Sequence, residues 1–222
     1  MQLSKIGSKI CRPIAGKVDG SGASGGGGGG GTQTFTVSAS ADDGYVFLAN
    51  QSTSTPTSGW GSPSNSGSNV YIGAVEDYDN WPNIYSHYLG YFRFQNITVA
   101  QGATISSAYL KPYKIGYPDR TASMKGISQD NVSAPTAGSD LAASNFTTAG
   151  ITNFVTGTGF GQITSPDIKD IVQEIVDRAG WASGNAMMLA VYAPLTGLST
   201  SWTARSFDYS SGSEAAELII ET

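Results

Sequence analysis

Short runs of apolar residues alternate with polar ones along most of this 222-residue chain, and glycine, proline, asparagine and serine separate the runs. Alternation with a period of two residues predicts half-buried β-strands. The densest signal covers residues 85–94 and 97–99, which are rich in aromatic and branched side chains. The other expected strands cover residues 34–40, 44–49, 70–74, 104–115, 125–127, 186–192, 200–207 and 216–221. Residues 50–69 are predicted to form a surface loop, and we assign no strand to the polar residues 131–161.

One segment has a helical period. Its apolar residues are spaced by three and four, which places them on one face of a helix. They are Ile168, Ile171, Val172, Ile175 and Val176. Ser165 suits the N-cap, Pro166 the first helical position, Asp167 the N-terminal dipole, and Gly180 the end. The pattern predicts an α-helix over about residues 165–179 that packs on the strands.

Many strands followed by one late helix predict an all-β fold, a jelly-roll-like β-sandwich with one α-helix and an extended N-terminal arm. Residues 32–222 are long enough to bury one sizeable core, so we expect them to form a single domain.

The run of glycines at residues 25–31 separates two unlike parts of the chain. A glycine tract loses much chain entropy on ordering and adds no side chain to a core, so its natural use is as a tether. We therefore divide the chain into a basic anchoring arm at residues 1–19, a tether at residues 20–31 and the sandwich at residues 32–222.

Charge is distributed unevenly between these parts. The chain has a formal net charge of −5, yet the arm has four basic residues against one acidic residue, a net +3. The remainder has 8 basic and 16 acidic residues, a net −8. A negative body repels phosphates, so we expect no nucleic acid partner. The arm is expected either to dock on a partner protein or to stay solvated. Its candidate docking residues are Lys5, Ile6, Lys9, Ile10, Arg12, Ile14 and Lys17.

Aromatic residues in polar loops are the best binding candidates, because flat rings stack on sugar faces at small entropic cost. The candidates are Trp60, Tyr78, Trp81 and Tyr117. Contact with a neighbouring subunit is an equally good explanation. Trp181 and Trp202 are instead expected to pack in the core or at the helix exit.

Clustered carboxylates suggest a structural calcium ion, because a hard cation prefers oxygen ligands from loops. The candidate ligands are Asp42, Asp43, Glu76, Asp77 and Asp79. No EF-hand spacing is present, and ordinary solvation of loop carboxylates is the favoured alternative. We expect no other cofactor.

Nothing in the sequence has the spacing of a catalytic motif. His87 is the single histidine, and no G-x-S-x-G pattern accompanies it, so a structural role is favoured. Cys11 is the single cysteine, which excludes an internal disulfide. No apolar run approaches the roughly 20 residues of a membrane span. We expect a protein that is neither an enzyme nor membrane-spanning.

Three segments carry a family resemblance: VAQGATISSAYL, TSPDIKDIVQEIVDRAGWASGNAMMLAVY and ARSFDYSSGSEAAELIIE. From about Thr34 onward the chain resembles a jelly-roll domain of phage virion proteins. That domain is similar to carbohydrate-binding-module-like and disaggregatase-related β-sandwich domains. The resemblance implies a β-sandwich with a helix over one open end. It also implies a structural or sugar-binding role, since such domains serve as spacers, receptor-binding tips and sugar-binding modules.

These observations favour a non-enzymatic bacteriophage virion protein, assembled in the host cytoplasm as a capsid decoration, head-fibre or tail-fibre component. Its expected partners are other virion proteins, further copies of itself, with a trimer as one option, and host surface glycans. A carbohydrate-binding module of a secreted or cell-surface protein is the open alternative. A polysaccharide-degrading enzyme is the least favoured reading.

Overall fold

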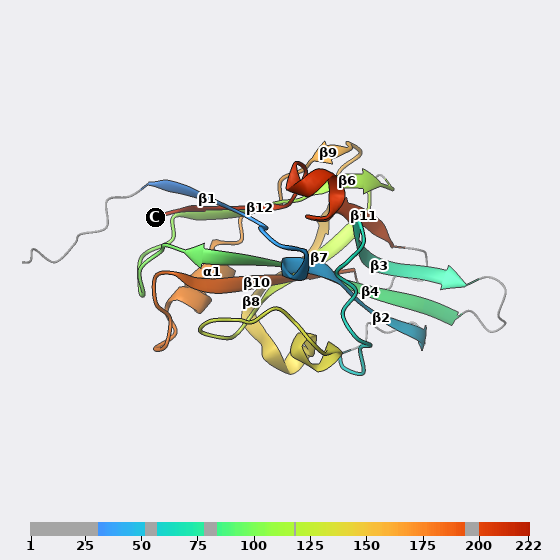
Figure 1. Cartoon of the computed structure of the whole chain (residues 1–222), viewed down its shortest axis with the longest axis horizontal. Coiled ribbons are helices and arrows are strands. Elements are labelled where there is room, and N and C mark those ends of the chain that lie inside the picture. Colours follow the sequence, from blue (N-terminus) through green and yellow to red (C-terminus); the bar gives the residue numbers. More distant parts are fainter. Residues whose placement is uncertain (1–30, 52–56, 78–83, 118, 194–199) are drawn as a thin grey trace, which may run out of the picture.

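The computed structural model describes residues 31–51, 57–77, 84–117, 119–193 and 200–222 (Figure 1). Within these ranges the chain folds as an all-β, jelly-roll-like sandwich with one α-helix, which confirms the predicted fold class. The predicted arm at residues 1–19 and the tether up to residue 30 lie outside the described residues.

Twelve strands and one α-helix make up the described chain. The strands are β1 Thr32–Thr36, β2 Asp43–Gln51, β3 Asn69–Asp77, β4 Ile84–Ile97, β5 Ser107–Lys111, β6 Tyr113–Gly116, β7 Thr121–Ile127, β8 Phe146–Val155, β9 Gly161–Gln162, β10 Asn185–Tyr192, β11 Trp202–Arg205 and β12 Glu217–Glu221. The helix α1 is Lys169–Val176, and short 3₁₀ turns lie at Ser40–Asp42, Gly138–Leu141, Ala143–Asn145 and Tyr209–Gly212.

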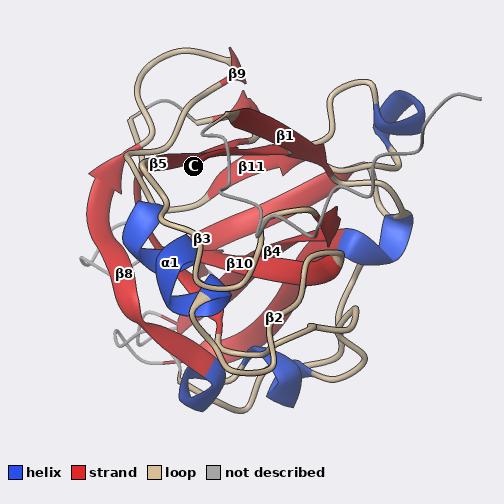
Figure 2. Cartoon of the chain, turned by 90° about the vertical axis from the view of Figure 1, so that its left-hand side faces the viewer, coloured by secondary structure: helices blue, strands red, loops and turns tan. Residues whose placement is uncertain are grey.

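The strands form two sheets in which neighbouring strands are antiparallel. The larger sheet has the order β8-β7-β10-β4-β3-β11-β6-β9, with β2 paired to β4, and the smaller has the order β1-β12-β5. Figure 2 shows how the larger sheet curls, with α1 lying beside β8. Residues 84–88 of β4 pair with β3 and residues 90–97 with β10, while β2 runs along residues 85–92. Strand β4 is therefore the centre of the larger sheet.

Each face of β4 and β10 is buried in a different core. On one face, Phe92 and Phe94 pack with Leu189 in an inner core between the two sheets and α1. On the other face, Leu89 and Tyr91 lie in an outer core, which the segments around Trp60 and Leu141 help to cover. Since side chains alternate along a strand, successive apolar residues in the middle of these strands belong to the two cores in turn.

The helix begins later than the sequence predicts. The Ser165 hydroxyl accepts a hydrogen bond from the Leu110 amide (3.0 Å) and donates one to the Pro166 carbonyl (2.7 Å), so it does not cap the helix. Asp167 accepts hydrogen bonds from the Ala108 and Lys169 amides (3.0 and 2.9 Å). Because these residues bind the backbone of β5, the chain turns into a helix only at Lys169.

The predicted strand at residues 104–115 is two strands, interrupted at Pro112, which has no N–H to donate. Strand β5 belongs to the smaller sheet and β6 to the larger one, so the chain changes sheets at this proline.

Strand β8 was not predicted, because its residues do not show a regular period of two. It lies at the edge of the larger sheet and is mostly exposed, and its pairing with β7 has two register shifts. Asn153 within it has a φ of 55°. An exposed strand interrupted by bulges leaves no regular apolar alternation in the sequence.

Side chains of β3 pack directly against Gly90 of β4 in the inner core. A Cβ at this position would lie 2.5 Å from Ile72 Cγ1 and 2.9 Å from Val70 Cγ1. We expect Gly90→Ala to lower the free energy of unfolding by about 1–3 kcal/mol through overpacking. Urea denaturation measures this loss.

Gly116→Ala is the matched control, because a Cβ on this strand residue would meet only ordinary contacts, from 3.5 Å outward. It should change the free energy of unfolding by less than about 0.5 kcal/mol. Equal effects of the two substitutions would contradict the close packing at Gly90.

Candidate binding surface

Four aromatic side chains pack against one another on an exposed face of β2, β3 and β4. We call this surface the aromatic face, and it consists of Tyr45, Phe47, Tyr71 and Tyr88. Phe47 is 37% exposed and Tyr71 is 39% exposed. Val75, which neighbours them on β3, is also 39% exposed. Large apolar side chains that remain exposed as a group, rather than singly, are typical of interaction surfaces, so we take the aromatic face as the candidate site.

The strand register brings these residues together from distant parts of the chain. Tyr88 lies opposite Phe47 of β2 and opposite Gly73 of β3. Residues directly opposite in an antiparallel pair project from the same side of the sheet, so Tyr45 and Tyr71, two residues away on the neighbouring strands, share that side. Gly73 adds no side chain between the rings of Tyr71 and Tyr88, whose centroids are 5.7 Å apart.

The rings hold one another in place. The ring centroids of Tyr45 and Tyr71 are 5.1 Å apart at 88°, and those of Tyr45 and Tyr88 are 5.6 Å apart at 63°. Phe47 lies 5.1 Å from Tyr88. These separations fall in the range of favourable edge-to-face and tilted aromatic pairs. The surface is thus ordered before any ligand arrives.

The Tyr88 phenol hydroxyl stays protonated at neutral pH. Burial raises the pKa of Tyr88 above its ordinary value of 10.0, and the neighbouring Tyr45 and Tyr71 raise it further. A neutral phenol can both donate and accept a hydrogen bond beside its apolar ring. The aromatic face therefore combines flat apolar area with hydrogen-bonding groups, which is the chemistry that sugars and protein surfaces both accept.

The strands that carry the aromatic face extend to one end of the molecule. In Figure 1, β2, β3 and β4 project together toward the right end of the long axis, whereas β1 begins near the left end. The described chain thus enters the sandwich at one end and presents this sheet at the other.

Trp60, expected to be an exposed loop aromatic, is buried with 8% of its surface accessible, and it packs in the outer core. Its segment folds back on β2, because the Gly61 amide donates to the Phe47 carbonyl (3.0 Å) and Tyr45 pairs with Ser64. Trp60 is therefore unavailable for stacking on a ligand.

Of the other loop aromatics, only Tyr117 is described. It is 54% exposed with a φ of 57°, and the Arg120 guanidinium lies 5.4 Å from its ring centroid. It makes no ring contact with the aromatic face. Tyr78 and Trp81 lie outside the described residues, in the connection between β3 and β4.

The two described carboxylates of the calcium hypothesis are buried rather than exposed in a loop. Asp42 accepts hydrogen bonds from Arg93 Nη1 (2.5 Å) and Gln95 Nε2 (2.6 Å). Asp43 accepts one from the Phe207 amide (2.9 Å). Protein donors thus occupy oxygens that a cation would need.

The remaining candidate ligands do not complete such a site in the described structure. The side chains of Glu76 and Asp77, and all of Asp79, lie outside the described part. Among the described side chains, no three of His, Cys, Asp and Glu come together to hold a metal ion. The arm residues Lys5 to Lys17 also lie outside the described chain.

The aromatic residues expected to be structural are buried. Trp181 is in the inner core, and its Nε1 donates to the Val99 carbonyl (3.0 Å). Trp202 is 1% exposed in the same core, which confirms the packing role predicted for both tryptophans. His87 is buried in β4, 2% exposed.

Comparison with known protein families and with curated proteins finds no match to this chain. The resemblance to a phage jelly-roll domain therefore remains an inference from the sequence. In the described part of the chain, no helix has both the length and the apolar character needed to cross a lipid bilayer.

Asp43 makes the stability of the protein depend on pH. Burial raises its pKa from 3.8 to about 7, with smaller contributions from Asp208 and Asp42. Between these values the folded state holds a proton that the unfolded state releases, so the free energy of unfolding falls as pH rises from about 4 to about 7. Asp43→Asn keeps an acceptor for the Phe207 amide and removes the charge. We expect it to flatten this decline, measured by urea denaturation from pH 5 to pH 8.

Asp140→Asn is the control with the opposite sign. Hydrogen bonds from the Thr136 and Ala137 amides lower the pKa of Asp140 below 3.8. Its stabilisation is therefore complete above pH 5, and the substitution should lower stability equally across the range. If the parent and Asp43→Asn proteins show the same slope, the buried Asp43 carboxyl does not titrate in this range.

Proposed function

We propose that this chain is a non-enzymatic structural protein of a bacteriophage virion, docked through its N-terminal arm. In this proposal the sandwich projects from the particle and presents its aromatic face to glycans on the host surface. A head-fibre, capsid decoration or tail-fibre position is compatible with that arrangement.

The sequence organisation supports docking through the arm. Residues 1–19 have a net charge of +3, a glycine tract follows them, and the rest of the chain has a net −8. A basic arm on a glycine-rich tether can reach an acidic partner while the negative body stays apart from it. The resemblance of the body to domains of phage virion proteins is the reason for proposing a bacteriophage virion as the particle.

The observation that carries the proposal is the position of the aromatic face. It lies on strands that project to the end of the long axis opposite the start of β1 (Figure 1). A tether that leaves from the beginning of β1 would place these strands on the side of the sandwich that is distant from the particle.

The chemistry of the aromatic face favours glycans among outward contacts. Rings that are partly exposed can stack on the apolar face of a sugar, and the hydroxyls of Tyr45, Tyr71 and Tyr88 can hydrogen-bond to sugar hydroxyls. A neutral glycan also meets no repulsion from a body of net charge −8.

Docking is tested by reversing the charge of the arm in the full chain. Replacing Lys5, Lys9, Arg12 and Lys17 together by Glu should reduce incorporation into particles by at least about tenfold, since four favourable charge contacts become repulsive. Copy number per purified particle, from quantitative mass spectrometry, measures the effect. The control replaces Lys111 and Lys169 of the body by Glu and should incorporate normally. Undiminished incorporation of the arm variant would refute docking by this segment.

Glycan contact is tested by removing rings from the aromatic face. Phe47→Ala with Tyr71→Ala should lower adsorption of particles to host cells by about tenfold, because stacking of each ring contributes about 0.5–1.5 kcal/mol. Phe160→Ala, which removes a 62% exposed ring from another surface, is the matched control. Normal adsorption of the double variant, with unchanged thermal stability and particle content, would refute this role.

A carbohydrate-binding module of a secreted or cell-surface protein is the second candidate, and the aromatic face favours it too. This alternative predicts that the full chain and a chain lacking residues 1–30 bind the same glycans with the same affinity, and that no particle contains the protein. A glycan array on both forms, together with the particle composition, separates the two functions.

A further inference from the structure

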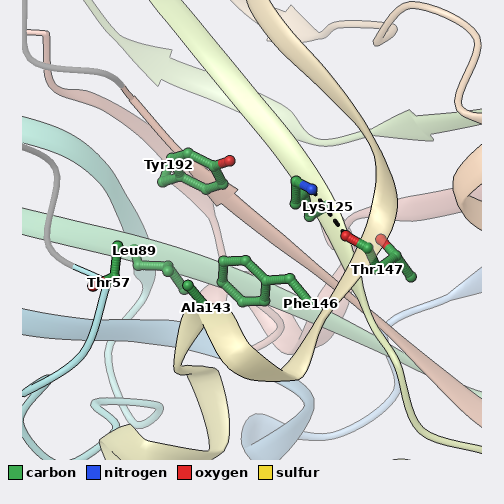
Figure 3. Close-up of a pocket in the computed structure, with 7 residues that line it drawn as sticks. All are labelled: Thr57, Leu89, Lys125, Ala143, Phe146, Thr147 and Tyr192. Carbon is green, nitrogen blue, oxygen red and sulfur yellow. Dashed lines mark hydrogen bonds between the residues drawn. The ribbon is translucent and has the colours of Figure 1, made fainter.

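Figure 3 shows a pocket of about 260 Å³ beside Leu89. Because Leu89 and Tyr88 project from opposite sides of β4, the pocket lies on the side of the larger sheet opposite the aromatic face. It is lined by Thr57, Leu89, Lys125, Ala143, Phe146, Thr147 and Tyr192. Leu89 follows Tyr88 in β4, so these consecutive residues serve opposite faces of one strand. The volume is below the roughly 300–1,000 Å³ of pockets for drug-sized ligands, which limits the occupant to about one ring.

The walls of the pocket are mainly apolar and aromatic. The rings of Phe146 and Tyr192 are stacked, with centroids 6.1 Å apart and planes inclined by 15°. Leu89 is 2% exposed and belongs to the outer core, and Ala143 closes another side. An occupant therefore needs an apolar portion, such as a methyl group or the face of a ring.

Lys125 supplies a hydrogen-bond donor to this apolar surface. Its Nζ donates to the Thr147 and Thr148 carbonyls, both at 2.9 Å, and these are its acceptors among the described residues. An ammonium group has three N–H donors, so one is left for an occupant. The Thr147 hydroxyl is already used, since it accepts from the Gly126 amide and donates to the Ala149 carbonyl.

Tyr192 adds a neutral hydroxyl beside this donor. In Figure 3 the Tyr192 hydroxyl and the Lys125 ammonium are both directed away from Leu89 and Ala143. Burial raises the pKa of Tyr192, so this hydroxyl stays protonated at neutral pH and can donate or accept. The pocket thus has an apolar side and a hydrogen-bonding side.

The surrounding charge favours a neutral occupant over an anion. The Glu174 carboxylate accepts hydrogen bonds from the Thr148 and Ala149 amides (2.8 and 2.7 Å), next to the carbonyls that hold Lys125. The body as a whole has a net charge of −8. Both oppose the entry of a carboxylate or phosphate, against the attraction of the single Lys125 ammonium in the pocket wall.

We propose that this pocket binds a single neutral sugar unit that carries an N-acetyl group. The acetyl methyl packs on Phe146, Tyr192 and Leu89, the acetyl oxygen accepts the remaining Lys125 N–H, and the sugar hydroxyls meet Tyr192 and Thr57. This site is separate from the aromatic face and does not depend on a virion location. Its failure would leave the tests of docking and adsorption unaffected.

Ligand-observed NMR on the full chain tests the proposal with N-acetylglucosamine, glucose and benzoate as probes. We expect N-acetylglucosamine to bind with a Kd of about 1 mM, the weak affinity of a single small ligand, with the strongest saturation transfer at its acetyl methyl. Glucose lacks the acetyl group and should bind at least about tenfold more weakly. Benzoate, a ring with an anionic group, should also bind more weakly.

Two substitutions locate the site. Lys125→Met keeps the apolar stem and removes the donor, and should weaken N-acetylglucosamine binding about tenfold. Tyr192→Phe keeps the ring and the stacking on Phe146, and should weaken binding severalfold without disturbing the fold. Phe160→Ala, which removes an exposed ring that lines neither this pocket nor the aromatic face, is the matched control and should bind like the parent. Thermal unfolding checks each variant.

Three results would overturn the assignment. The first is no binding of N-acetylglucosamine at about 10 mM, ten times the expected Kd. The second is tighter binding of benzoate than of N-acetylglucosamine, which would make the pocket an anion site. The third is unchanged N-acetylglucosamine binding by Tyr192→Phe and by a folded Lys125→Met, which would place the sugar elsewhere.

Discussion

Burial of the central strands on both faces is the constraint on which the rest of the structure depends. Phe92 and Phe94 of β4 lie in the inner core, and Leu89 and Tyr91 lie in the outer core. A sheet with a core on each side needs other elements to cover both, and here different kinds of element cover the two sides. The smaller sheet and α1 close the inner core, whereas loop segments and short 3₁₀ turns help to close the outer one. The pocket lies where this less regular cover meets the sheet.

The larger sheet, which lies between the inner and outer cores, also carries the aromatic face. The inner face of β4 is covered around Phe92, but at Tyr88 it becomes the aromatic face. Gly90 lies between these two regions, where the Ile72 and Val70 side chains of β3 pack against it. The molecule thus uses one continuous sheet both as the wall of its core and as the support of the aromatic face.

Much of the fold could be predicted from the sequence, because most strands and the amphipathic helix have regular periods. Strand β8 could not, since its bulges and exposure remove the period, and the late start of α1 could not, since Ser165 and Asp167 bind β5. The aromatic face was harder to predict than these elements. The alternation Tyr45-x-Phe47 was visible, but only the pairing of β2 with β4 and β3 shows that Tyr88 and Tyr71 complete the surface. The prediction that Trp60 is exposed was wrong for a related reason. A polar segment can fold back over a sheet and bury its one large side chain.

Tyr88 and Leu89 are neighbours in the chain but serve opposite surfaces of β4. Inserting or deleting one residue before them would exchange the two sets of side chains, turning rings inward and aliphatic groups outward along the whole strand. Each surface can therefore diverge through replacement of individual side chains, while the length of this strand is held fixed by the needs of both.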